Sequence, residues 1–252
     1  MPKGRTLRIP ASRSLVCDVL RLDRLVPSCA HDRVFELGAL TDARTCTDVR
    51  VSWPAIFMKA YALTAREFPR LRQTWMTLPW SHLYEHHEQV GTLVVHRRFE
   101  NDDWLFWGQI SNIDARPVSD IQAAIDRFQT DPVEQIFKRQ VWLSRRSPAF
   151  RRFAWWLTFQ PSGKKRCKRL GTFFLSTISG LGAEIQEPPS MLTSGFTYGP
   201  MDDQGRTRVT ITYDHRLLDG HHVANILVAF ERTMQTVMLD EVSALQSSRS
   251  AA

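Results

Sequence analysis

The stretch that decides the fold is Thr212-Tyr213-Asp214-His215-Arg216-Leu217-Leu218-Asp219-Gly220. It follows a strand candidate and precedes a helix candidate, and such a junction can present a side chain to a cleft. Histidine titrates near neutrality, so His215 can take a proton from a thiol or a hydroxyl. The Asp219 carboxylate can brace the loop by pairing with an arginine, and Gly220 allows a tight exit. The residues alone leave a second interpretation open, in which His215 is simply a polar residue in a turn.

Helix and strand signals alternate along the chain. Ser52 and Pro54 suit the start of a helix that Pro69 ends, the pair Ser119 and Gln122 reads as a capping box, and a further helix begins at residues 131–134. Strand candidates are residues 34–40, 90–99, 104–110, 172–178, 195–198 and 208–213, and an acidic turn at 100–103 makes 90–110 a hairpin.

The last strand candidate and the final helix both carry periodic apolar residues. Residues 209, 211 and 213 are apolar or aromatic and alternate with threonines, so one face of this strand should be buried. After Gly220, apolar residues recur every three or four positions, as in a helix that packs one face on a sheet. The interleaving predicts an α/β fold, an α+β sandwich with a mixed sheet flanked by helices.

Composition narrows the class of protein. The 252 residues are 43% hydrophobic and 23% charged, as in a soluble globular protein, with no apolar run long enough to span a bilayer. Residues 1–5 lead into polar sequence without an apolar leader. The four cysteines show no C-x-x-C spacing, which favours free thiols and a cytoplasmic location.

The basic segment 138–169 holds eleven Lys or Arg and no Asp or Glu. The whole chain carries +7, so the remainder carries 7 − 11 = −4. Several tryptophans and phenylalanines lie among these charges. Three interpretations stay open: a solvated face over a packed aromatic core, attraction of the phosphates of coenzyme A or an acyl carrier protein, and an amphipathic helix on a membrane surface. No nucleic acid partner is expected, because no recognised binding fold is present.

Residues 214–220, followed by a helix, resemble the C-terminal signature of the acyltransferase catalytic domain of 2-oxo acid dehydrogenase complexes, whose fold chloramphenicol acetyltransferase shares. Residues 171–182, Gly-Thr-Phe-Phe-Leu-Ser-Thr-Ile-Ser-Gly-Leu-Gly, are similar to a second family segment. Residues 52–72, with Lys-Ala at 59–60 and Phe-Pro-Arg-Leu-Arg at 68–72, are similar to a family helix. The three occur in family order and imply a chloramphenicol acetyltransferase-like fold.

The resemblance implies roles for individual residues. His215 matches the family's base, and Ser179 matches the serine that stabilises the oxyanion of the tetrahedral intermediate; Thr177 and Ser176 are the alternates if the register shifts. The motif aspartate pairs with an N-terminal arginine in chloramphenicol acetyltransferase, for which Arg13 is the first candidate here and Arg21 the second. The implied reaction moves an acyl group between a thioester, of coenzyme A or lipoamide type, and a thiol or hydroxyl, with no metal.

The chain also departs from the family. We expect one catalytic domain over residues 1–252, with no lipoyl or subunit-binding domain, and Gly180 replaces the family's asparagine. Relatives that join two such folds place the active site between them. One copy therefore implies a homotrimer with active sites at subunit interfaces, where His215 of one subunit faces Ser179 of the next.

Other classes of function compete with this interpretation. Residues 82–87 contain H-x-x-E-H, which binds zinc when a helix places both histidines on one face. His221 and His222 suit surface positions at a helix start better than metal ligation. The main alternative is a non-catalytic trimeric scaffold, a core component of a complex that keeps the motif for packing.

Overall fold

The structure is a computed structural model that describes residues 4–160 and 162–247. The domain is expected over residues 1–252, of which residues 1–3, 161 and 248–252 lie outside the described part. The first residues of the N-terminus, which is predicted to have no apolar leader, are among them. No helix within the described ranges is both long and apolar enough to cross a membrane.

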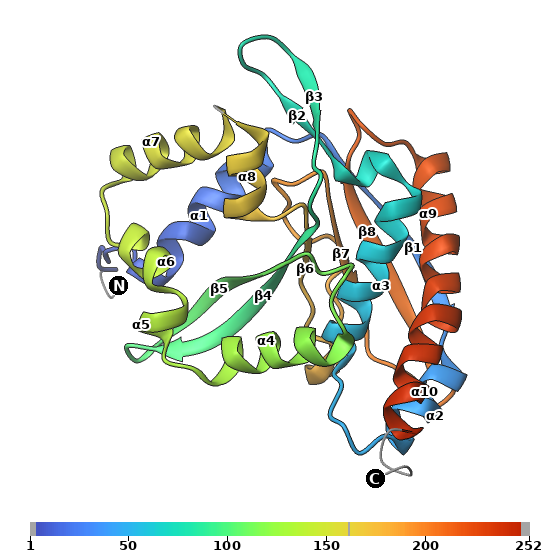
Figure 1. Ribbon diagram of the computed structural model, residues 1–252. Coiled ribbons are helices and arrows are strands. Elements are labelled where there is room, and N and C mark those ends of the chain that lie inside the picture. The colour runs from blue at the N-terminus through green and yellow to red at the C-terminus, as the bar shows by residue number, and fades with distance from the viewer. Residues whose placement is uncertain (1–3, 161, 248–252) are drawn as a thin grey trace.

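A mixed six-stranded sheet forms the centre of the molecule (Figure 1). The strand order is β1-β8-β7-β6-β4-β5; β4, β6 and β7 run parallel, and the other neighbours pair antiparallel. A separate two-stranded hairpin projects from it. The strands are β1 (Ser28–Glu36), β4 (Val90–Phe99), β5 (Asp102–Ser111), β6 (Phe173–Leu175), β7 (Ser194–Tyr198), β8 (Arg206–Asp214), and in the hairpin β2 (Gln73–Met76) and β3 (His82–Glu85).

The main core lies between one face of the sheet and three helices, α3 (Trp53–Glu67), α4 (Val118–Thr130) and α9 (Gly220–Thr233). Tyr61 of α3 stacks on Phe196 of β7 at 4.7 Å between ring centroids, and Phe230 of α9 meets both rings edge-on. The Tyr61 hydroxyl donates to Ser194 Oγ at 2.7 Å, so its polar end is satisfied inside the core. A five-residue π-helix (Met234–Met238) and α10 (Leu239–Ser247) continue from α9 and contact α2 (Gly38–Cys46).

The remaining helices cover the β5 edge and the opposite face. Short helices α5 (Val133–Ile136) and α6 (Lys138–Ser144) pack at the β5 edge, where Phe106 stacks on Phe137. On the opposite face, Phe174 of β6 meets Leu170 of α8 (Gly163–Leu170) and the inner rings of α7 (Pro148–Phe159). The basic segment 138–169 therefore forms three helices, α6 to α8, and α1 (Ala11–Asp23) packs beside them (Figure 1).

The α/β fold with a mixed sheet flanked by helices is confirmed, as are the helix at α3 and the hairpin β4–β5. The strand predicted at 34–40 is wrong at its end, because the chain turns at Leu37 into α2. Leu37 and Leu40 are both buried there at the three-residue spacing of a helix. The strand predicted at 172–178 is only three residues long, since the Ser176 N–H makes the last backbone bond to β7, at the Phe196 carbonyl, and the chain then leaves the sheet for a turn at 179–181.

The predicted helix caps are wrong as well, whereas the predicted buried face of the last strand is confirmed, and its threonine face is buried too. Ser52 makes no capping bond, and Gln122 accepts from the Ser52 N–H instead of closing a capping box, since α4 begins earlier, at Val118. The helix predicted from residue 131 lasts one turn. Residues 209–214 of β8 are buried on both faces, because β8 is an inner strand of a sheet covered on each side.

Candidate active site

His215 is the first residue after β8. Its backbone N–H donates to the Pro27 carbonyl at 2.9 Å, which ties the turn to the chain entering β1. Its side chain is exposed, and its ring centroid lies 5.9 Å from that of buried Tyr213. The Tyr213 hydroxyl lies 3.2 Å from His31 Nδ1. The imidazole is thus held at a fixed strand end yet remains open to a group arriving from outside the subunit.

Asp219 is the N-cap of α9. It accepts the His222 backbone N–H at 3.0 Å, and its carboxylate lies 2.8 Å from His222 Nδ1. These bonds, the backbone one foremost, hold the pKa of Asp219 below its ordinary value. The predicted pairing with an N-terminal arginine does not occur: Arg13 lies near Asp102, and Arg21 lines a cleft described below.

Gly220 is needed for close approach. A Cβ at this position would lie 3.0 Å from His31 Nε2, tighter than an ordinary van der Waals contact. The first turn of α9 therefore packs directly against β1. The chain therefore leaves the motif through a tight turn, as expected, and the group that makes the space tight is the His31 ring of β1.

Ser179 begins a short 3-10 turn (Ser179–Leu181) after β6. The Thr177 hydroxyl lies 3.1 Å from Ser179 Oγ and 3.0 Å from the Tyr198 carbonyl, and it accepts the Ser179 N–H at 3.1 Å. The nearby Ser176 is anchored through its backbone to β7. Thr177 and Ser179 are thus both half-buried, and each is hydrogen-bonded within its own chain, to the other hydroxyl and to Tyr198. The exposed part of the loop lies next to Ser179. Leu181 beside it is 85% exposed.

His215 and Ser179 lie at opposite ends of the β7–β8 pair. The serine loop bonds Tyr198, whose partner across the ladder is Val209, whereas His215 follows Asp214 at the far end of β8. From Val209 to Asp214, the strand spans about 17 Å at about 3.3 Å per residue. The two groups therefore do not meet within one chain.

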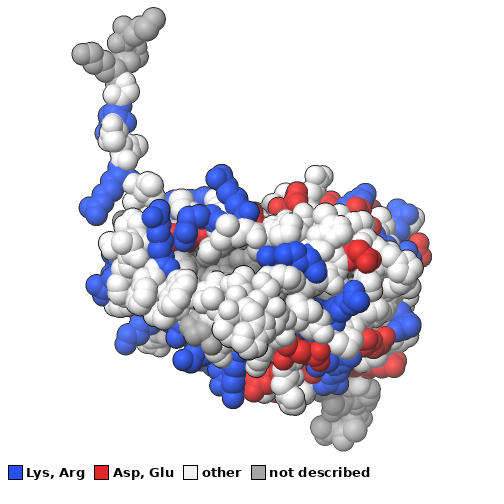
Figure 2. All heavy atoms as spheres, turned by 90° about the horizontal axis from the view of Figure 1, so that it is seen from above, with Lys and Arg blue, Asp and Glu red and all other residues white. Residues whose placement is uncertain are grey.

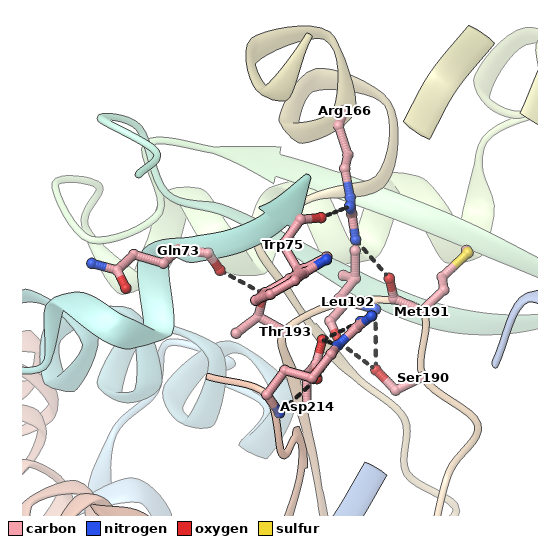
Figure 3. A network of polar contacts seen from close by, with 9 residues as sticks. Gln73, Trp75, Arg166, Ser190, Met191, Leu192, Thr193 and Asp214 are labelled. Carbon is pink, nitrogen blue, oxygen red and sulfur yellow. Dashed lines mark hydrogen bonds and ion pairs between the residues drawn. The ribbon is translucent and has the colours of Figure 1, made fainter. Parts of the chain in front are cut away.

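A charged network surrounds Asp214, the residue that precedes His215 in the chain (Figure 3). The carboxylate of Asp214, only 3% exposed, takes a two-pronged bond from Arg216, with Nε at 2.9 Å and Nη2 at 2.6 Å. The Arg216 guanidinium lies over the Trp75 ring, 5.4 Å from its centroid. Arg166 of α8 donates to the carbonyls of Trp75 and Met191 at 3.1 and 3.0 Å.

The sequence analysis did not predict this network. Asp214 and Arg216 are visible in the sequence as opposite charges two residues apart. Trp75 and Arg166, however, come from the β2–β3 hairpin and from α8, distant in sequence. Burial foremost, with the charge of Arg216 adding to it and that of Asp214 opposing, lowers the pKa of Arg166 to about 10. Arg166 still stays protonated at neutral pH.

A cleft of about 400 Å³ opens beside the network. It lies between the C-terminal end of α1, helices α7 and α8, and strand β2. Among the described residues, four arginines line it, Arg21, Arg152, Arg166 and Arg216, and no acidic side chain does. Looking down on this end of the molecule, Figure 2 shows Lys and Arg gathered around a hollow and Asp and Glu gathered toward the other side.

The segment with the zinc-like spacing is not a helix. Residues 82–85 form strand β3, and His86 is buried against Tyr84. Burial first, and then the charge of Arg166, lower the pKa of His86 to about 4. Throughout the described ranges, no group of three or more His, Cys, Asp or Glu side chains is placed to hold a metal ion. The zinc interpretation is therefore wrong.

No protein-family model and no curated protein matches the chain. Among solved structures, a probable dihydrolipoamide acetyltransferase from Listeria monocytogenes aligns with a TM-score of 0.67 and 17% identity, over 93% of this chain and 95% of that one. The dihydrolipoamide acetyltransferase of Azotobacter vinelandii aligns at 0.64 and 16%, over 93% of each. That structure was studied for the catalytic roles of a serine, a histidine and, four residues after it, an asparagine.

A chloramphenicol acetyltransferase aligns with a TM-score of 0.51 and 14% identity, over 90% of this chain and 98% of that one. At such identities a structural likeness establishes the fold alone. The chain has the fold of dihydrolipoamide acetyltransferase catalytic cores and of chloramphenicol acetyltransferase.

Proposed function

We propose that this protein is an acyltransferase in which His215 is the general base. The imidazole takes the proton of an acceptor thiol or hydroxyl, and the acceptor oxygen or sulfur attacks the carbonyl carbon of an acyl thioester. Ser179 donates a hydrogen bond to the oxyanion as charge develops on it. The carbon–sulfur bond then breaks, the acyl group stays on the acceptor, and the leaving thiolate takes the proton from the imidazolium.

The observation that carries this proposal is the placement of His215. It leaves an inner strand at a fixed, exposed turn, on a fold found in acyltransferases, and Asp219 follows it after four residues. The Azotobacter vinelandii enzyme has its histidine and asparagine at the same spacing. Asp219 of this chain, as the helix cap, positions the start of α9 and so the exit of the turn.

The separation of His215 and Ser179 supports a shared active site. Since about 17 Å of strand lies between them in one chain, a complete site needs the serine of a second copy. The serine loop offers an apolar edge for such a contact, because Ile178 and Leu181 are exposed beside Ser179. We infer a homotrimer with three equivalent sites at its interfaces.

We place the reaction in the cytoplasm, on a single catalytic domain, with a coenzyme A thioester as the acyl donor. A lipoyl thioester is the alternative donor. Cys167, the buried cysteine, plays no part in this scheme, because burial raises the pKa of its thiol to about 11. Nothing in the proposed steps calls for a metal.

The segment 138–169 is where we place contact with a larger partner, an acyl carrier or a membrane surface. Its inner side is packed, with Trp155 Nε1 donating to Asp18 at 3.0 Å. Its outer side presents Phe150 and Phe153 of α7, exposed among basic residues. Exposed rings beside Lys and Arg suit the interface of an anionic membrane better than a purely polar carrier surface.

A panel of acyl-coenzyme A thioesters, assayed by thiol release, tests the enzyme against the scaffold alternative. We expect turnover by the wild type and its loss, by about a hundredfold or more, in His215→Ala. His221→Ala is the matched control, an exposed histidine on α9 outside the proposed chemistry. A wild type that assembles but turns over no donor would favour the non-catalytic trimeric scaffold.

A further inference from the structure

The cleft between α1, α7 and α8 carries more positive charge than its own surroundings neutralise. Asp214 pairs with Arg216, and Arg166 is held by two carbonyl groups that carry no net charge. The side chains of Arg21 and Arg152 form neither a hydrogen bond nor an ion pair with any described residue. Four guanidinium groups thus share one buried carboxylate, a surplus that attracts an anion.

The two carboxylates of α1, Asp18 and Asp23, have partners of their own. Asp18 accepts from Arg151 Nε at 2.7 Å and from Trp155, and Asp23 accepts the Ser190 N–H at 2.7 Å. Neither lines the cleft. The lowered pKa of Arg166 fits the same picture, because its burial first, and then the like charge of Arg216, disfavour its charged form.

The rest of the lining is apolar. Rings of Trp75, Trp155 and Phe159 and aliphatic chains such as Leu22 and Met191 form much of the wall. Such a surface, with a few convergent charged groups, is typical of a site for a small organic ligand. A bare inorganic anion would leave these rings and chains in contact with water.

We propose that this cleft binds an anion carried on an apolar body, a carboxylate or phosphate attached to an aliphatic or aromatic group. The anion lies against Arg21 and Arg152 at the mouth and against Arg166 and Arg216 inside. Arg216 follows His215 directly in the chain, so the ligand lies near the turn that carries the proposed base, although His215 itself does not line the cleft. The inference rests on the proposed acyl transfer only in calling this ligand a substrate.

Titration calorimetry on the wild-type protein tests the site without any turnover, so its failure is separate from a failure of the proposed function. The probes are decanoate and decyl phosphate, with decanol as the neutral match. We expect both anions to bind at least about tenfold more tightly than decanol, and salt to weaken only the anions. Equal binding of decanol and decanoate would overturn the proposal.

The variant Arg21→Gln/Arg152→Gln removes the two arginines without described partners, so the fold should persist. We expect about a tenfold or greater loss of decanoate affinity and no change for decanol. Arg98→Gln, an exposed arginine near the far turn of β4, is the matched control and should bind as the wild type. Unchanged decanoate binding in the double variant would contradict the proposal.

Competition with coenzyme A distinguishes two sources of the anion. If coenzyme A displaces decanoate in the wild type and loses affinity in the double variant, the cleft holds a phosphate of the coenzyme. If coenzyme A does not displace decanoate, the anion that the cleft binds belongs to the acyl acceptor or the acyl group and not to the coenzyme. Both results support the anion site and differ only in the molecule that fills it.

Discussion

At the scale of single residues, the turn that carries His215 depends on its neighbour Asp214. The Asp214 carboxylate accepts the Arg216 backbone N–H at 3.0 Å as well as the Arg216 side chain. It is also the counter charge that Arg166 feels most among charged groups. One buried carboxylate therefore fixes the turn and offsets part of the positive charge of the arginines behind it.

Asp214→Asn should lower the free energy of unfolding by about 2 kcal/mol, because Arg216 and Arg166 lose their counter charge. The loss is smaller than for a fully buried ion pair, because the Arg216 side chain is partly exposed to water. Urea denaturation measures it. The control is Asp103→Asn on the exposed hairpin turn, for which we expect a change within about 0.5 kcal/mol. Equal losses in the two variants would show that the Asp214 network adds nothing.

The local part of the site could be predicted from the sequence. His215, Asp219 and Gly220 lie at a strand-to-helix junction, as their types and spacing indicate. The partner of Asp219 was predicted wrongly as an N-terminal arginine. In the structure Asp219 caps the helix, and His222, three residues on, supplies both the backbone N–H and the ring that contact the carboxylate. Trp75 reaches the turn only through tertiary packing, which no local pattern encodes.

At the scale of elements, α7 has two different faces. Its inner face is fastened to α1, where Arg151 and Asp18 form an ion pair buried on both sides. Its outer face carries Phe150 and Phe153, one helical turn apart and exposed. The inner face holds the helix in place, and the outer face is exposed to a partner. We therefore expect that Phe150 and Phe153 can be replaced without unfolding the helix.

Wild-type protein should co-sediment with vesicles that contain anionic lipid, and less so as salt rises. Phe150→Ser/Phe153→Ser should weaken this binding at least about tenfold, since both rings would enter the interface. Val228→Ser, an exposed apolar residue on α9, is the control. Absence of vesicle binding by the wild type, with capture by an acyl carrier protein instead, would assign the segment to a carrier.

Strand β3 leads to a buried histidine that should make stability depend on pH. The pKa of His86 is about 4 in the folded protein against 6.5 ordinarily, so the unfolded chain binds more protons between these values. The stabilisation is complete above pH 6.5 and is lost as the pH falls toward 4. We expect His86→Gln to remove about 2 kcal/mol of the difference in unfolding free energy between pH 7 and pH 5.

Denaturation at the two pH values measures this loss. His87→Gln changes an exposed neighbour and should keep the wild-type dependence on pH. If His86→Gln and the wild type showed the same pH dependence, His86 would not be the group responsible.

Element predictions succeeded where the pattern was long and failed where tertiary contacts decide. Helix α3 and the β4–β5 hairpin each have ten or more residues of consistent pattern, and both are present. Strand β6 lasts only three residues because the chain turns away from β7 after Ser176, which local sequence does not show. The buried outer face of β8 likewise follows from its place inside the sheet.

At the scale of the whole molecule, topology separates the two proposed catalytic groups. The antiparallel pair β7–β8 places the serine loop and His215 at its opposite ends. No side chain reaches across about 17 Å of strand, so a working site requires two copies of the chain. The proposed trimer is thus part of the proposed mechanism.

Mixing two inactive variants tests this central claim most directly. His215→Ala and Ser179→Ala subunits, each without transfer activity, are unfolded together in equal amounts and reassembled, and thiol release is measured. Each site takes its histidine from one subunit and its serine from another, so random assembly should restore about a quarter of wild-type activity. Reassembled single variants are the control and should stay inactive. If the mixture also stays inactive while reassembled wild type works, the two residues do not act across an interface, and the account of a shared site is contradicted.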